Sequence, residues 1–386
     1  MRPADCSKVD GGADTTTSGS ETRALSDVEA ERSVDAASAY LSALESVISS
    51  VCDVTKADDR IGPKRLPPIT VLLAEVPLLL EGGLVRRLTW LCDRSPAWGK
   101  VALLTMRELI MSKHTRKRVL LSLAISQLLE MQNADLQQST VRMLANQVYP
   151  GLQPDEQQGV EDAAVRLIAD YQPEVPGRGM EETPEFIAHR LRLCSNACQL
   201  LTSLCTKRSA LLGRFCEVYM TAAPLVRTAL LDGARQVGAM LNADSPHVVD
   251  LVRNQPEGTE DVVVAVLEGV LPKTQGIAPP GLVAACVDLY STRNDVRVLA
   301  LAIPGMPPSQ ALEHVRHLVR LEPSAFDSTM RLLVMVPEGG GDALLSAVDV
   351  LIQLHLAKPE DLNVRFESLS TCLCRYCLDT PSVFTF

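Results

Sequence analysis

The stretch that decides the fold runs from Ser245 to Val252 and reads SPHVVDLV. A serine suits the position before a helix, and Pro246 suits the first helical position, where an N–H has no partner within the helix. The apolar residues that follow recur at three- and four-residue steps: Val248, Val249, Leu251 and Val252. This period places them on one face of a helix. The stretch therefore predicts a helix that begins at Pro246.

Proline and capping residues also mark predicted helix starts further along the chain. Pro279-Pro280 and Pro307-Pro308 each precede an apolar stripe, and Ser324 with Asp327, just after Pro323, has the spacing of a capping box. A helix from Leu344 to Ile352 is expected after the glycines at 339–341, which read as a connector. Upstream, we expect a long helix from Pro184 to Cys205 and another from about Ser209. Apolar stripes of helical period also occupy the ranges 40–51, 84–91, 101–110, 120–131 and 141–148.

Composition favours the same fold class. Hydrophobic residues make up 46 % of the chain but aromatic residues only 4 %, so the core must consist mainly of Leu, Val, Ala and Met. These residues suit helix-on-helix packing better than a sheet. Short helices in antiparallel pairs, at a repeat length of roughly 35 to 45 residues, are typical of an α-solenoid. We therefore predict an all-α, HEAT/ARM-like α-solenoid with a disordered N-terminal segment.

Four segments follow from the composition of the chain. Residues 1–25 are rich in Thr, Ser, Gly and Asp and are predicted to be disordered, and a capping box at Ser26 and Glu29 predicts where order begins. N-terminal helical repeats are expected over 26–172. The Pro- and Gly-rich residues 173–183 form a connector. A second set of helical repeats is expected over 184–386.

Charge and cysteine content exclude some classes of protein. A formal net charge of −10 argues against a general nucleic-acid binder, which needs a basic surface. The sequence has no apolar run of about 18 residues and no signal-peptide core, so no membrane contact is expected and the chain should stay in the cytosol or nucleus. The 11 cysteines are spread along the chain and favour reduced thiols in the core over a disulfide framework.

No catalytic motif emerges, so we expect a protein that is not an enzyme and uses no cofactor. His314 and His317 lie beside Glu313, but the spacing differs from the H-E-x-x-H of zinc peptidases, and a solvated helix face is favoured. Cys372, Cys374 and Cys377 form a C-x-C-x-x-C cluster. Buried thiols are the favoured reading of this cluster, and a metal site is the alternative.

One charged run could serve a partner. Residues 113–118 read KHTRKR, and Lys113, Arg116, Lys117 and Arg118 are the candidate residues for a basic partner-binding patch. Such a patch could contact an acidic protein or an RNA backbone, or form part of a nuclear-import signal. A solvated turn between two helices is the alternative.

The second half of the chain resembles the C-terminal region of the symplekin family. The resemblance rests on the order of several segments: Phe215 to Tyr219, Ala223 to Leu230, Met240 to Pro246, Leu251 to Glu260, Asp288 to Tyr290, Asp295 to Leu299 and Leu318 to Pro323. In the first half, Ala74 to Leu79 and Thr105 to Ile110 resemble family helices in matching order. These motifs are structural, not catalytic, so the resemblance draws its specificity from order and coverage.

The resemblance implies a nuclear, non-catalytic scaffold for pre-mRNA 3′-end cleavage and polyadenylation. The implied partners are cleavage and polyadenylation specificity factor subunits, namely the endonuclease and its inactive paralogue, with the cleavage stimulation factor and an indirect association with RNA. The family's phosphatase-binding N-terminal domain has no counterpart here, and the family continues beyond the position of Phe386. The alternative function is a cytoplasmic HEAT/armadillo-type adaptor in trafficking or transport.

Overall fold

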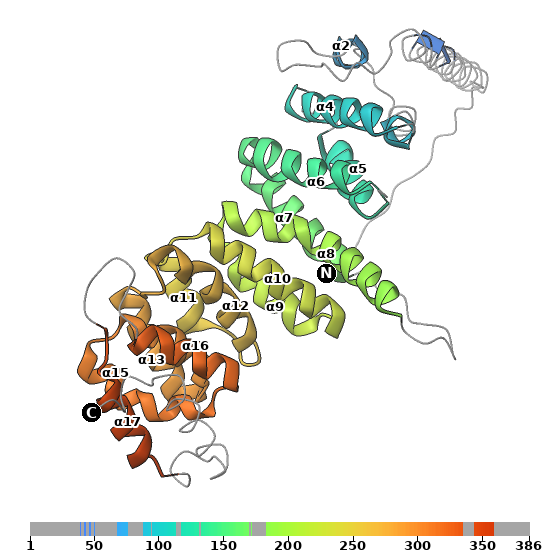
Figure 1. Ribbon diagram of the computed structural model, residues 1–386. Coiled ribbons are helices and arrows are strands. Elements are labelled where there is room, and N and C mark those ends of the chain that lie inside the picture. The colour runs from blue at the N-terminus through green and yellow to red at the C-terminus, as the bar shows by residue number, and fades with distance from the viewer. Residues whose placement is uncertain are drawn as a thin grey trace, which may run out of the picture. The chain divides into compact units, whose positions relative to one another are not determined.

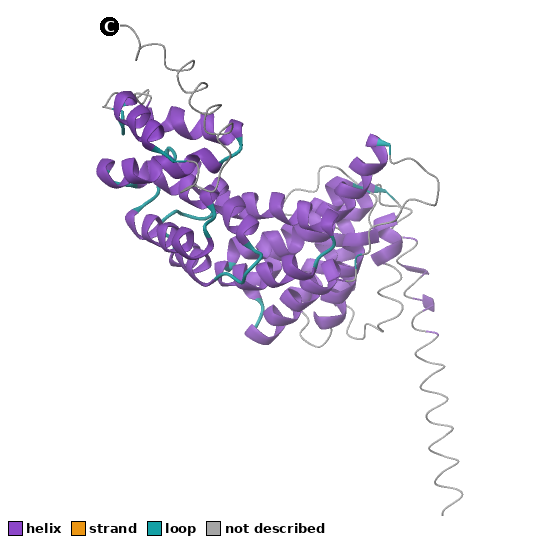
Figure 2. Cartoon of the chain, turned by 90° about the horizontal axis from the view of Figure 1, so that it is seen from below, coloured by secondary structure: helices purple, strands orange, loops and turns teal. Residues whose placement is uncertain are grey.

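A computed structural model describes residues 68–75, 88–93, 95–112, 117–130, 133–169, 171, 183–334 and 343–358, with isolated positions between 39 and 50. Within these ranges every regular element is a helix and none is a strand (Figure 2). The prediction of an all-α protein is confirmed for this part of the chain. The expected disorder of residues 1–25, the capping box at Ser26 and the Cys372 cluster lie outside the described residues.

Contacts divide the chain into two compact units, Met1–Arg116 and Lys117–Phe386. In the first unit, α2 (Pro68–Glu75) packs against α4 (Pro96–Ser112). The two helices are joined by a buried hydrogen bond between the hydroxyls of Thr70 and Thr105, 2.8 Å apart. Beside this bond, Leu73 and Met106 are fully buried, so an apolar contact with one polar link holds the pair together.

The first unit also includes the helical residues 88–93, and the helices from α5 onward belong to the second unit. Its α-helices are α5 (Lys117–Glu130), α6 (Ala134–Arg142), α7 (Pro154–Ala169), α8 (Pro184–Lys207), α9 (Leu212–Thr221), α10 (Pro224–Met240), α11 (Pro246–Asn254), α12 (Glu260–Val270), α13 (Pro280–Arg293), α14 (Val296–Ala302), α15 (Pro308–Val315), α16 (Pro323–Val334) and α17 (Ala347–Leu356). Short turns link them: a π-helical turn η2 (Met143–Val148), and 3-10 turns η3 (Tyr149–Gly151), η4 (Ser209–Leu211), η5 (Leu271–Thr274), η6 (Ile303–Gly305) and η7 (Arg316–Arg320).

From α5 to α14, each helix packs on the next helix but one. Helices α8, α10, α12 and α14 form one row, and α10 lies between α8 and α12 (Figure 1). Helices α7, α9, α11 and α13 form a second row, each touching the next. Consecutive helices therefore alternate between two rows. A continuous apolar core lies between the rows, with Phe215 and Val252 fully buried in the second and Val266 in the first.

The contacts along the first row bring two backbones unusually close. A Cβ atom placed on Gly238 of α10 would lie within 3.0 Å of the backbone carbonyl of Val266 on α12. A Cβ on Gly269 of α12 would come equally close to the carbonyl of Arg235 on α10. On the other side of α10, a Cβ on Gly233 would lie 2.6 Å from the hydroxyl oxygen of Thr202 on α8. Glycine is therefore required where α10 crosses α12, since a side chain at Gly238 or Gly269 would force the two backbones apart.

Most of the predicted helix starts are confirmed. Helices begin at Pro184, Pro246, Pro280 and Pro308, with Ser245 as the residue before α11. The capping box predicted at Ser324 is wrong, because α16 begins one residue earlier at Pro323 and Ser324 lies inside it.

The predicted start at Leu344 is also wrong, since α17 begins at Ala347. Leu345 instead lies before that helix and donates its backbone N–H to the carbonyl of Leu333 on α16, at 2.9 Å. An apolar residue in a connector can thus extend the apparent helical stripe without joining the helix.

The cysteines that the structure describes are free thiols, as predicted. Cys194, Cys198, Cys205, Cys216 and Cys286 are buried, and Cys92 is partly buried. Burial raises the pKa of Cys198 and of Cys286 to about 12 in each case, with the charge of Cys194 contributing to the former. These side chains therefore stay neutral and pack as small apolar residues.

The division expected at residues 173–183 is not where the two compact units separate. Helices α7 and α8, which flank that segment, pack against each other and belong to the same unit. The units separate instead between Arg116 and Lys117, inside the charged run. Composition marked a connector here, but a connector between two packed helices is not a domain boundary.

The close crossing of α10 and α12 at Gly238 and Gly269 predicts how one added methyl group changes the stability of the chain. Gly238→Ala or Gly269→Ala should destabilise the chain by about 2 kcal/mol, because the clash outweighs the gain of about 1 kcal/mol in helix propensity. Urea unfolding followed by circular dichroism measures the change. Gly159→Ala on α7 is the control, since nothing lies within 4 Å of its added Cβ, and it should leave stability unchanged or raise it. Equal behaviour of all three variants would contradict the close crossing.

Candidate functional site

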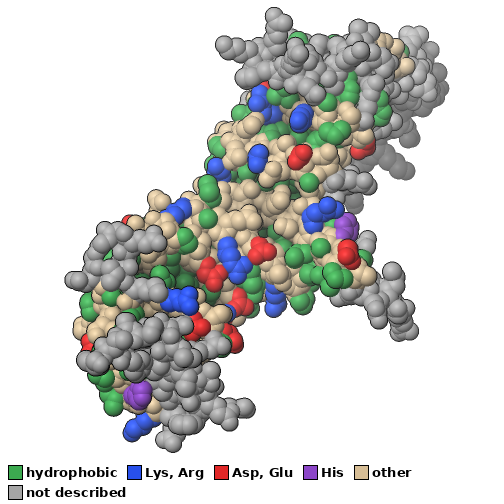
Figure 3. Space-filling model, in the orientation of Figure 1, with side chains coloured by type: hydrophobic (Ala, Val, Ile, Leu, Met, Phe, Trp, Pro, Cys, Tyr) green, Lys and Arg blue, Asp and Glu red, His purple; other side chains and the backbone are tan. Residues whose placement is uncertain are grey.

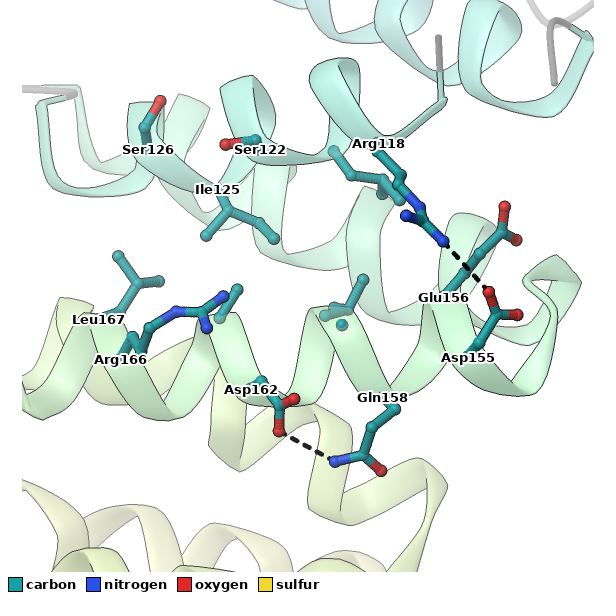
Figure 4. A pocket seen from close by; sticks show the side chains of 14 residues that line it. Arg118, Ser122, Ile125, Ser126, Asp155, Glu156, Gln158, Asp162, Arg166 and Leu167 are labelled. Atoms are coloured by element: carbon teal, nitrogen blue, oxygen red, sulfur yellow. Dashed lines mark hydrogen bonds and ion pairs between the residues drawn. The ribbon is translucent and has the colours of Figure 1, made fainter. Parts of the chain in front are cut away.

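A groove of the second unit lies between α5 and α7. It has a volume of about 690 Å³ and is lined by residues of both helices (Figure 4). Its apolar lining consists of Leu121 and Ile125 from α5 and Val160, Ala163 and Leu167 from α7. Gly159 of α7 also lines the groove and is exposed, so that the chain leaves space there. A groove of this shape with an apolar floor can receive a helix or side chains of another protein.

Charged side chains surround the apolar lining. The guanidinium of Arg118 on α5 lies 3.4 Å from the carboxylate of Asp155 on α7, across the groove (Figure 4). Both side chains are largely exposed, so this pair contributes little to stability and can exchange its partner for a ligand. Farther along α7, the Gln158 amide donates to Asp162 at 2.9 Å, and Arg166 also lines the groove. The rim thus offers charges of both signs.

Buried polar contacts fix the start of α7. The Glu156 carboxylate accepts a hydrogen bond from the backbone N–H of Gln153 at 3.0 Å, which caps the helix, and lies 3.1 Å from the Lys117 ammonium of α5. Lys117 and Glu156 are both largely buried in this pair. The hydrogen bond from Gln153 and the charge of Lys117 hold the pKa of Glu156 below its usual value. The pair ties α5 to α7 at one end of the groove.

The opposite face of α7 is fixed by a buried carboxylate. Glu161 is 1 % exposed. It accepts hydrogen bonds from the Tyr149 hydroxyl at 2.5 Å and from Arg208, which caps the C-terminus of α8, at 2.8 Å. Next to it, Arg214 of α9 donates to Asp162 at 2.8 Å. Helix α7 is therefore held by η3, α8 and α9 behind the groove that it lines.

The predicted basic patch is only partly described. Lys113 and Arg116 lie outside the described residues. Lys117 is 5 % exposed and its ammonium is paired with Glu156, so Lys117 does not offer its charge to a partner, contrary to the prediction. Arg118 is 86 % exposed in its side chain and lies on the rim of the groove. Among the described residues of the patch, Arg118 is the accessible one, and it belongs to the groove.

The histidine pair does not lie on a solvated face. His314 and His317 are about half buried and pack with Tyr290, with ring centroids 5.7 to 6.3 Å apart. Burial lowers the pKa of both imidazoles, and nearby Arg316 lowers them further. The solvated face expected from the sequence is thus wrong, because η7 turns His317 back toward α13. Within the described ranges, no cluster of three or more His, Cys, Asp or Glu side chains has the arrangement of a metal site.

Neither a protein-family profile nor a solved structure matches this chain. Among the described residues, no helix combines the length and the apolar character needed to cross a membrane. On the face of the molecule in Figure 3, basic and acidic side chains are interspersed with hydrophobic ones. The groove is therefore assigned on its geometry alone.

Because Glu161 is buried and its neighbour Asp162 is partly exposed, the two carboxylates should contribute differently to the stability of the fold. The Glu161 carboxylate lies 2.8 Å from the guanidinium of Arg208 and 3.8 Å from that of Arg214. Glu161→Gln should destabilise the chain by about 2 kcal/mol, because it removes this buried counter-charge, although both arginines keep partial contact with water. Asp162→Asn is the control, since its carboxylate is 40 % exposed, and it should cost less than about 1 kcal/mol. Urea unfolding at neutral pH measures both values, and a smaller loss for Glu161→Gln than for Asp162→Asn would overturn this account.

The lowered pKa of Glu156 predicts a dependence of stability on pH. Because its folded pKa lies below the unfolded value of about 4.3, its contribution is present above that pH and is lost as the pH falls through the folded pKa. Glu156→Gln should therefore be less stable than the unaltered chain at neutral pH, and the difference should shrink in acid.

Chemical unfolding over a pH series measures this difference. Glu185→Gln serves as the control because Glu185 is likewise in the first turn of a helix, α8, but is exposed. A Glu156→Gln variant that keeps the same deficit at every pH would rule out the carboxylate as its cause.

Proposed function

We propose that this chain is a non-catalytic scaffold of the machinery that cleaves and polyadenylates the 3′ ends of pre-mRNA in the nucleus. The proposal rests on one observation: the segments that resemble the symplekin family follow in the same order from Phe215 to Pro323. A fold alone does not imply a function, since helical repeats serve many. The order of the matching segments is what favours this function over that of a general adaptor.

The structure supports this proposal by explaining what those segments do. Phe215 and Val252 fill the core, and Asp295 caps α14 by accepting from the backbone N–H of Arg297 at 2.9 Å. Arg297 also pairs with Asp261 on α12, at 2.6 Å. Phe215, Val252 and Asp295, which lie in the resembling segments, are thus core or capping residues of α9, α11 and α14.

The packing of alternate helices supports an α-solenoid of antiparallel helix pairs. In such an array each repeat contacts its neighbours, and the exposed faces of many helices remain free for partners. We propose that the groove between α5 and α7 is one partner surface. Its apolar floor and mixed-charge rim suit an amphipathic helix of a partner protein, with apolar side chains against Ile125 and Leu167 and charged ones beside Arg118.

Quantitative affinity capture from nuclear extract tests the proposal. The tagged chain should recover the cleavage endonuclease and its inactive paralogue. Gly159→Arg should reduce recovery of at least one partner by about tenfold, a loss of about 1.4 kcal/mol in binding, because the new side chain fills the groove. Gly281→Arg on α13 is the matched control: Gly281 is also an exposed helical glycine with nothing within 4 Å of its Cβ, and it lies away from the groove.

The outcomes separate the two parts of the proposal. If the chain recovers the endonuclease and both variants lose recovery equally or not at all, the groove is not a partner surface. The scaffold function would then still be supported. Recovery of trafficking or transport factors alone, without the processing factors, would favour the adaptor function and contradict the scaffold.

A further inference from the structure

A second, smaller cleft lies between α11 and the turn that leads into α9. It has a volume of about 110 Å³, far above the roughly 10–15 Å³ that one water molecule requires. Its mouth carries exposed residues, among them Asp250 and Asn254 of α11 and Gly213 of α9. Its inner part is formed by buried residues, among them Cys216 and Gln255. This cleft is separate from the groove between α5 and α7.

The side chain of Gln255 lacks hydrogen-bond partners in this cleft. The residue is 9 % exposed, and neither Nε2 nor Oε1 has a partner within the described structure. A buried donor and a buried acceptor without partners are costly to fold, and native structures rarely leave them so.

The backbone holds Gln255 in this position. Helix α11 ends at Asn254, and Gln255 takes an extended conformation, with φ −61° and ψ 143°, as a residue before proline prefers. The next residues form a tight turn in which Gly258 has a φ of +88° and the Thr259 hydroxyl donates to the Pro256 carbonyl at 2.7 Å. The side chain is therefore placed by a constrained turn and not by a flexible loop.

Two neighbouring polar groups already have partners. The Asn254 amide donates to the Asp250 carboxylate at 2.5 Å. The Cys216 thiol forms a hydrogen bond with Thr259, and burial still raises the pKa of this thiol to about 11. Neither group forms a hydrogen bond with the Gln255 side chain. A ligand that enters the cleft would find one donor and one acceptor, side by side on the same planar amide.

We propose that this cleft binds a carboxamide group of a polypeptide ligand. A carboxamide presents an acceptor beside a donor in one plane, which complements the Gln255 amide with two hydrogen bonds. The carboxamide would come from an Asn or Gln side chain, because the N–H and C=O of a trans main-chain peptide group point in opposite directions and cannot both bond to the same amide. Leu212 and Leu251 line the cleft and would contact the adjacent carbon atoms. This site stands independently of the proposed scaffold function.

Nuclear magnetic resonance of the full chain, labelled with ¹⁵N in its glutamine side chains, tests the site. Acetamide represents an Asn or Gln side chain. It should shift the Gln255 amide signals saturably, with a Kd in the millimolar range expected of so small a ligand. N-methylacetamide, whose N–H points away from its C=O, and N,N-dimethylacetamide, which has no N–H, should bind more weakly because neither can make both hydrogen bonds.

Two variants assign and control the signal. Gln255→Met keeps the length of the side chain, should abolish the assigned signals and should not lower the melting temperature, since it removes two unpaired polar atoms. Gln236→Met on α10 changes an exposed glutamine and should leave the titration unchanged. Absence of a saturable shift with acetamide would mean that water alone fills the cleft and would overturn the proposal. Equal binding of N-methylacetamide or N,N-dimethylacetamide would also overturn it, because binding would then not use the donor and the acceptor together.

Discussion

The spacing of the helices in the second unit depends on how closely α10 approaches α8 and α12. At Gly238 and Gly269 the backbones of α10 and α12 touch without side chains between them, whereas Gly233 of α10 faces the side chain of Thr202 on α8. A contact between backbones tolerates little variation in distance, because neither helix has a flexible side chain that could move aside. The spacing of the first row of helices is therefore set at these crossings, and the apolar side chains fill the space that remains.

The row of helices that contains α8 and α10 also fixes the position of α7, which lines the groove at the surface. Helix α8 packs on α10 and, through Arg208 at its C-terminus, holds Glu161 of α7. Helix α7 is thereby fixed on its buried face while its other face lines the groove with α5. Both surfaces proposed for ligands share this design: the groove and the Gln255 cleft each lie beside an element that ion pairs or a constrained turn hold in place. Rigid helices with exposed faces between them suit a protein that positions others.

Much of the fold was predictable from the sequence, because proline at a helix start acts through local sterics alone. What failed needed tertiary information. Leu345 looked helical because it is apolar, yet its burial comes from α16. Lys117 looked like surface charge, but its partner Glu156 lies 39 residues away. The groove carries no motif at all, since Leu121, Ile125 and Leu167 read as ordinary core residues. The unpaired state of Gln255 likewise follows only from its surroundings.

The central claim is that this chain itself holds the processing factors together. Purified chain mixed with the purified endonuclease and its inactive paralogue, and separated by size-exclusion chromatography with light scattering, tests it most directly. The account predicts one species whose mass is the sum of all three proteins. Separate elution of the chain from both factors at micromolar concentrations, with every component folded, would contradict it.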